Sequence, residues 1–471
     1  MTPATRHLPI SIIGWFFLSW ILATGLLIWP ADSLNDYLRW LIFIGAIWLY
    51  FTILASGSHC YFLSPLFLAG AITIVFYSIG PFLYGAIFPD SIPYYTSRSP
   101  TSAHAHAIFY IGSNAERLIL QFSAFCFLIL SVIIKWHIQT KPLPKTSAKS
   151  YPRYLLGLFH ILVLGFAILF IMSRWSSFGQ AYLSSGLGSE ARHALAPLMS
   201  ISITALAYFS ARERTALKWA GALSMVVALI SMIVSGLAVT AVYTVLVAIL
   251  LFLLSAKIKP KNLLPIIGMA ALVIPAVILV TVISRGEVKN AKSTVTEYAV
   301  AKLLSKLIFR QTTSGACLNE VYEKYPSSES TNPLFFTMAI VPRALWPEKP
   351  SLSRGSEYAE KYCGQTGAIK QRHSESITLL GEPLLNGGIL GVIVAQLCLA
   401  VFFFIATNLL ASGKPAQTIL VVALLPWLAT FEQHFGVYFA NLVKTMIIML
   451  PLFLVLIYSL WRHRKTLTGK F

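Results

Sequence analysis

Charged residues are scarce in this 471-residue chain. Only 11% of its residues are charged and 57% are hydrophobic, whereas an ordinary soluble domain carries roughly 25% charged residues. The mean hydropathy of +0.73 points the same way. This composition excludes an ordinary soluble protein and predicts an all-α polytopic membrane protein.

Acidic residues are the scarcest charges: 17 Asp and Glu stand against 36 Lys and Arg, a formal net charge of +19. In a soluble protein this excess would suggest nucleic acid, but no stretch resembles a nucleic-acid-binding module. In membrane proteins Lys and Arg gather in cytoplasmic loops. We therefore read the excess as a sign of topology and expect no nucleic-acid partner.

Cysteine is also rare, and its five copies show no CxxC or Cys/His spacing of a zinc or redox motif. The sequence likewise has no DxD motif or clustered acids that would hold a metal ion. We expect no metal and no cofactor. Cys317 and Cys363 both lie in one long hydrophilic loop. The sequence allows either a disulfide between them or two free thiols.

Long apolar runs are the main positive feature, since about 20 apolar residues cross roughly 30 Å of hydrocarbon. They predict twelve spans. One pair forms a hairpin over residues 219–256 that turns at Ser235 and Gly236. Pro65 and Pro81 predict a kinked or broken third span. The other ten spans are expected at residues 10–29, 38–55, 61–88, 118–134, 154–172, 194–210, 263–283, 388–410, 416–431 and 437–460.

The spans divide the chain into three parts: residues 1–283 with spans one to nine, a large loop over 284–387, and 388–471 with the last three spans and a basic tail. The short loops richest in Lys and Arg, such as residues 135–153 and 257–261, are assigned to the cytoplasm. Both termini are then cytoplasmic and the large loop faces outward.

The large loop holds the residues that best suit chemistry. Three prolines within residues 342–350 forbid a regular helix, because each lacks an amide donor and restricts the residue before it. Arg343, Lys349 and Arg354 follow at short intervals and suit a phosphate group. A proline-stiffened linker with solvated charges is the alternative.

Two more cations are candidates. A helical pattern over residues 293–325 predicts a helix on the outer membrane surface, with Arg310 directed either into the bundle or to solvent. Lys444 lies about two turns inside the last span. An ionisable residue at that depth is expected to face a cavity, unless it snorkels to the surface.

Glu382 is a candidate general base, because it stands beside glycine and proline where the chain enters the tenth span. Its alternative roles are to cap the helix that follows it or to pair with an arginine. His373 and Glu375 are the rival bases.

Several of these segments together resemble one family. They are Asn332-Pro333, the run from Ile340 to Pro350, the run from Ser376 to Glu382, and Asn386-Gly387-Gly388 before a span. The set resembles the Wzy-type oligosaccharide repeat-unit polymerases, which include O-antigen polymerases. The chain departs from many relatives at the hairpin turn, where Leu237 and not an arginine follows Gly236.

The resemblance implies a GT-C-like glycosyltransferase in the bacterial inner membrane. Such an enzyme moves the growing glycan from undecaprenyl pyrophosphate to an incoming lipid-linked unit at the periplasmic face. A chain-length regulator and a flippase are the expected partners, and the product is O-antigen, capsule or exopolysaccharide.

The resemblance also implies roles for the candidate residues. The cations would bind the donor pyrophosphate: Arg343 first, with Arg310, Lys349, Arg354 and Lys444. The proton of the acceptor hydroxyl would pass to Glu382, His373 or Glu375. Two rival functions stay open, an O-antigen ligase on a similar scaffold and a transporter or flippase of lipid-linked sugars. Transporters usually contain internal repeats of spans, which we do not find.

Overall fold

The protein is all-helical in the parts that the computed structural model describes, and no strand occurs there. Two compact units divide the chain. Unit 1 comprises Met1–Leu143, Leu304–Thr407 and Ala429–Asn441, and unit 2 comprises Pro144–Leu303, Asn408–Leu428 and Leu442–Phe471. The described residues are 34–56, 59–74, 77, 113–140, 151–175, 187–213, 215–235, 237–256, 310–328, 338, 341, 346, 348, 354–363, 367, 369 and 376–468.

Among the described residues, six helices are long and apolar enough to cross a membrane, which fits the membrane protein that the composition predicts. Their candidate spans are Ala115–His137, Arg153–Met172, Arg192–Ser210, Ala216–Val234, Thr378–Ala411 and Phe435–Thr466. They agree with the predicted spans four to seven, ten and twelve.

Shorter apolar helices stand at four further predicted spans: Arg39–Tyr50, Pro65–Ile74, Tyr243–Ser255 and Pro415–Leu428. The third predicted span is broken at Pro65, where a 3-10 helix (η2, His59–Leu63) ends and α3 (Pro65–Ile74) begins. The predicted spans over residues 10–29 and 263–283 lie outside the described residues. The total of twelve therefore stays a prediction.

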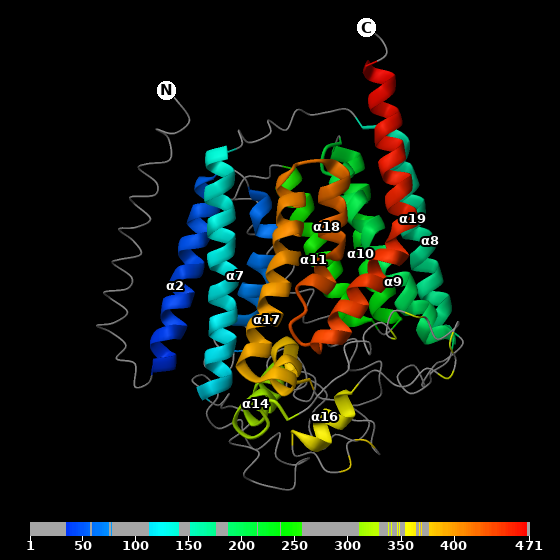
Figure 1. Cartoon of the computed structure of the whole chain (residues 1–471). Coiled ribbons are helices and arrows are strands. Elements are labelled where there is room, and N and C mark those ends of the chain that lie inside the picture. Colours follow the sequence, from blue (N-terminus) through cyan, green and yellow to red (C-terminus); the bar gives the residue numbers. More distant parts are fainter. Residues whose placement is uncertain are drawn as a thin grey trace, which may run out of the picture. The chain divides into compact units, whose positions relative to one another are not determined.

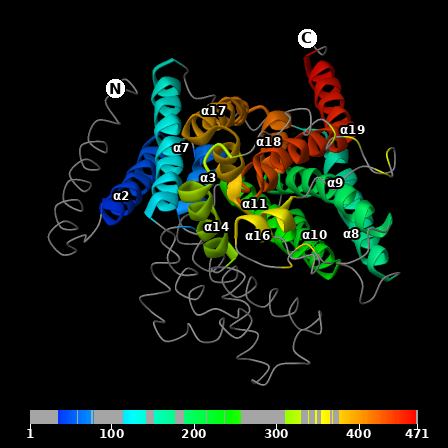
Figure 2. The ribbon, with the colours of Figure 1, turned by 60° about the horizontal axis from the view of Figure 1, so that its bottom comes forward.

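In unit 1 three of the other helices pack against α7 (Ser113–Thr140). Gly70 of α3 lies so close to the ring of Phe127 that an added Cβ would come within 2.7 Å of it. Figure 2 shows the arrangement, in which α7 contacts α2 (Leu34–Ala55), α3 and α14 (Arg310–Lys324).

Polar side chains also join the helices of unit 1. The amides of Gln121 in α7 and Gln396 in α17 (Thr378–Ala411) exchange hydrogen bonds of 3.1 and 3.0 Å. Arg39 of α2 donates from Nε to Glu116 of α7 at 3.0 Å. Such bonds hold helices together where hydrocarbon offers no other partner.

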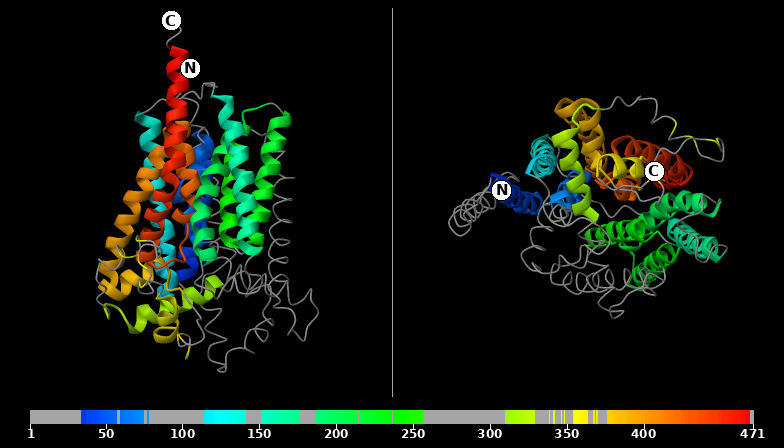
Figure 3. Two further views of the ribbon diagram at one scale, coloured as in Figure 1. Left: turned by 90° about the vertical axis from the view of Figure 1, so that its right-hand side faces the viewer. Right: turned by 90° about the horizontal axis from the view of Figure 1, so that it is seen from below.

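In unit 2 the central helix is α9 (Leu187–Ser210), and residues 199–211 are all buried. Ser200 donates its hydroxyl hydrogen to the carbonyl of Ala423 at 2.7 Å. Figure 3 shows these helices from two sides. Around α9 pack α8 (Arg153–Trp175), α10 (Thr215–Val234), α11 (Ala238–Ser255) and α18 (Pro415–Leu428).

The hairpin predicted over residues 219–256 is confirmed, because α10 ends at Val234 and α11 begins at Ala238. The N–H of Leu237 closes the turn by donating to the carbonyl of Met232 at 3.0 Å. Arg192 at the start of α9 is 5% exposed and donates to the carbonyl of Ser235 at 3.0 Å. The turn is thereby attached to α9.

Basic residues gather at one end of unit 2. The hydroxyl of Tyr151, just before α8, donates to Glu213 at 2.6 Å and so joins the start of α8 to the end of α9. Burial is the main reason that the pKa of this tyrosine is raised. At this end, the upper end in Figure 1, α8, α10 and α18 begin and α9 and α19 (Phe435–Thr468) end. The basic residues in or next to these helix ends are Arg153, Arg212, Lys218, Lys414, Arg464 and Lys465.

Candidate functional site

Two helices of the large loop, α14 and α16 (Gly355–Lys361), lie beyond the ends of α7 and α17 in unit 1 (Figure 1). Cys317 of α14 and Cys363 form a disulfide, with their Cα atoms 4.9 Å apart. Of the two alternatives left open by the sequence, the structure contains the bridge. The side chain of Asn319 accepts the N–H of Ala115 at 3.4 Å, which attaches α14 to the start of α7. α16 is therefore tied to the bundle through α14.

The end of the bundle that faces α16 contains a broken helix. In α17 the backbone leaves helical geometry at Gly387 and at Gly388, whose φ of 56° lies in the left-handed region that glycine favours. The break brings Pro383 against Gly391, where an added Cβ would meet the Pro383 carbonyl oxygen at 2.2 Å. A short helix over residues 378–386 thus precedes the long segment that was predicted to start at residue 388.

Glu382 lies in this short helix and is 4% exposed. Its Oε2 accepts the N–H of Gly436 at 2.8 Å, and its Oε1 accepts the hydroxyl of Tyr358 at 3.4 Å. Gly436 is the second residue of α19 (Phe435–Thr468), whose first N–H groups have no partner within the helix. The carboxylate therefore caps α19, and not the helix that directly follows Glu382, which was the cap expected from the sequence.

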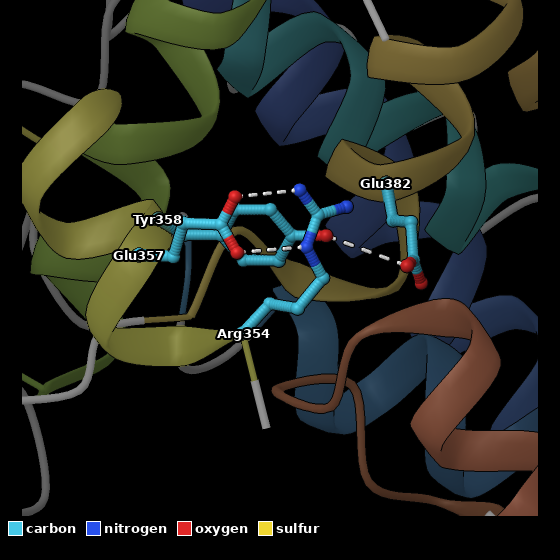
Figure 4. A network of polar contacts seen from close by, with 4 residues as sticks. All are labelled: Arg354, Glu357, Tyr358 and Glu382. Carbon is cyan, nitrogen blue, oxygen red and sulfur yellow. Dashed lines mark hydrogen bonds and ion pairs between the residues drawn. The ribbon is translucent and has the colours of Figure 1, made fainter. Parts of the chain in front are cut away.

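Tyr358 lies between the cation of Arg354 and the carboxylate of Glu382 and contacts both (Figure 4). The Tyr358 side chain is fully buried in α16, and the guanidinium carbon of Arg354 lies 4.9 Å from its ring centre. Arg354 also forms two bonds to Glu357, from Nε at 3.0 Å and from Nη2 at 2.8 Å. The Arg354 side chain is 18% exposed and that of Glu357 45%, so one edge of the cluster reaches solvent.

His434 completes the cluster from the turn before α19. Its ring meets that of Tyr358 edge to face, with the centres 4.6 Å apart, and the side chain is 8% exposed. Burial, and then the charge of Arg354, lower the pKa of His434 to about 4. At neutral pH this imidazole is therefore uncharged.

The structure unites two of the eight predicted site residues, Glu382 and Arg354, through Tyr358. Arg310 is the first residue of α14, and Lys444 lies in the part of α19 that belongs to unit 2. The other four lie outside the described residues: Arg343, Lys349, His373 and Glu375.

The cluster has the parts of a polar reaction site: a buried carboxylate, a cation and a neutral imidazole around one tyrosine. Within the described ranges, no group of three or more His, Cys, Asp or Glu side chains is placed to hold a metal ion. No family model, curated protein or solved structure matches the chain.

Proposed function

We propose that this protein is a membrane glycosyltransferase that polymerises lipid-linked oligosaccharide repeat units. The observation that carries the proposal is the placement of Arg354 and the buried Glu382 on one tyrosine, at the end of the bundle in unit 1. The segments that resemble repeat-unit polymerases provide Glu382 and surround Arg354 in the sequence.

The chemistry requires a base and a cation. The acceptor hydroxyl oxygen attacks the anomeric carbon of the donor sugar, and its proton passes to Glu382. The bond from that carbon to pyrophosphate breaks, and the leaving group takes the electron pair. Arg354 is one cation suited to it, because a pyrophosphate could replace Glu357 in the two-bond pairing.

The remaining candidate residues keep the roles that the resemblance implies. Arg343 is the first further ligand of the donor pyrophosphate, and His373 and Glu375 are the alternative bases. Arg310, Lys349 and Lys444 are the other proposed cations.

The side of the membrane is proposed on two grounds. The bond between Cys317 and Cys363 favours an oxidising compartment for the large loop, such as the bacterial periplasm. The basic residues at one end of unit 2 favour a cytoplasmic position for that end, which includes the C-terminal part of α19. Both suit a polymerase of the bacterial inner membrane with cytoplasmic termini.

The decisive experiment uses the purified full chain in lipid nanodiscs, supplied with the lipid-linked unit that accumulates in a deletion strain. We expect a ladder of lipid-linked polymers. Arg354→Ala and Arg343→Ala should each lower the rate by about 10²- to 10³-fold, the usual cost of one transition-state donor. Accumulation of long lipid-linked chains in the deletion strain, and not of single repeats, would indicate a ligase instead.

A further inference from the structure

The imidazole of His434 has a buried nitrogen that lacks a hydrogen-bond partner among the described residues. This atom, Nδ1, has less than 1 Å² of accessible surface. A buried polar atom left unpaired destabilises the folded protein, and a phenylalanine would fill a similar space without that cost. A ligand that pairs with the nitrogen would explain why an imidazole stands here.

The position of His434 connects it with the candidate base. Its ring packs edge to face on Tyr358, the residue whose hydroxyl donates to Glu382. The other oxygen of Glu382 accepts the N–H of Gly436, two residues after His434. The imidazole and the carboxylate are thus held by the same tyrosine and by the same turn.

The charges around His434 indicate which chemistry it can bind. Arg354 lies near it from the position just before α16, Tyr358 contacts its ring, and Glu382 lies beyond the tyrosine hydroxyl. Burial and Arg354 keep the imidazole neutral, and a neutral imidazole has one donor and one acceptor nitrogen. A hydroxyl group, which both donates and accepts, suits it. An anion such as pyrophosphate only accepts hydrogen bonds, so it would use the one N–H of the neutral ring and leave the acceptor nitrogen unused.

We propose that His434 hydrogen-bonds a hydroxyl group of the acceptor sugar and so forms an acceptor-binding position beside Glu382. The inference rests on the proposed function, because it takes the acceptor of that reaction as the ligand. Since Nδ1 is covered, the ring turns or its cover moves when the sugar binds.

The test uses the full chain in nanodiscs and, as probe, the oligosaccharide released from the lipid-linked unit of a deletion strain. This probe lacks pyrophosphate, so its binding reports the sugar site alone. His434→Phe keeps a ring against Tyr358 and removes both nitrogens. We expect it to raise the dissociation constant of the oligosaccharide by about 2- to 10-fold, as the loss of one hydrogen bond implies. The control His463→Phe, in the last turns of α19, should leave the constant unchanged.

Equal affinities of the wild type and His434→Phe would overturn the inference, and so would a wild type that does not bind the probe. If His434→Phe does not fold, ¹⁵N-histidine NMR of the wild type decides: the His434 signals must shift on adding the oligosaccharide, and unchanged signals overturn the inference. Binding that depends on His434 in a protein that makes no polymer would support the sugar site and overturn the polymerase. If the wild type makes polymer and His434→Phe binds the oligosaccharide as tightly as the wild type does, the polymerase is supported and the sugar site at His434 is overturned.

Discussion

Two roles meet in the carboxylate of Glu382, which caps α19 and is the candidate base. Glu382→Gln separates them, since the amide oxygen can still accept the N–H of Gly436 but cannot take a proton at neutral pH. We expect the rate of polymer synthesis to fall about 10²- to 10⁴-fold, with the melting temperature nearly unchanged. Glu320→Gln, on the surface of α14, is the matched control. Full activity of Glu382→Gln would show that Glu382 caps α19 but is not the base.

The burial of His434 makes stability depend on pH. A histidine in the unfolded chain binds a proton near pH 6.5, whereas His434 in the folded protein does so only near pH 4. Protons therefore favour the unfolded state as the pH falls from about 6.5 to 4, by about 3 kcal/mol. Thermal unfolding of the purified protein over this range should show the loss. His434→Phe should show a smaller one, and an equal loss in both would contradict the assignment.

Among the single residues of the site, the sequence predicts some and misses others. Glu382 stands out because glycine and proline flank it at the start of a span, and Arg354 because it follows a basic, proline-rich stretch. Tyr358 and His434 carry no such local signal. Their importance comes from contacts with residues far along the chain, which periodicity and spacing in one sequence do not encode.

Among the elements, the break in α17 places Glu382, and one glycine contact maintains it. Gly391→Ala would put a Cβ at 2.2 Å from the carbonyl oxygen of Pro383, so the short helix has to shift. We expect a loss of about 1 to 3 kcal/mol, as for other overpacked sites, together with reduced polymer synthesis. Gly387→Ala is the matched control, because an added Cβ there has no neighbour within 4 Å. Similar melting temperatures for the two variants would refute this account of the kink.

The disulfide between α14 and Cys363, two residues after α16, leads to a second prediction at the scale of the elements. Cys317→Ser should lower stability by about 2 to 4 kcal/mol, because the bridge closes a long loop in the unfolded chain. It should also lower activity, since α16 carries Tyr358. Unfolding scans without reductant measure the first effect, and Cys398→Ser, at an exposed free cysteine, is the control. Two alkylatable thiols at positions 317 and 363 in unreduced wild type would mean that the bridge is not formed.

The elements also show where sequence patterns succeed. The hairpin of α10 and α11 was predictable because its apolar run is too long for one span and is interrupted only at Ser235-Gly236. The start of α17 was not, since residues 378–386 form a separate helix that depends on the contact between Pro383 and Gly391. The large loop contains only two cysteines, so the sequence allowed only two states for them: a disulfide between Cys317 and Cys363 or two free thiols.

For the whole molecule, the proposed topology predicts the outcome of reporter fusions. A reporter fused after residue 330 should be active only outside the cytoplasm, and one fused after residue 414 or 468 only inside it. The physical reason is the distribution of Lys and Arg over the short loops. A cytoplasmic residue 330 would overturn both the topology and the proposed glycosyl transfer at the outer face.

The bond from Gly436 to Glu382 has a further consequence if Glu382 is the base. Proton uptake would remove the negative charge that stabilises the positive end of the α19 dipole, so the first turn of α19 would be weakened in every catalytic cycle and restored when the proton leaves. The carboxylate of Glu382 would then serve both the proton transfer and the stability of the first turn of α19. Hydrogen exchange at the Gly436 amide, faster during turnover than at rest, would record that coupling.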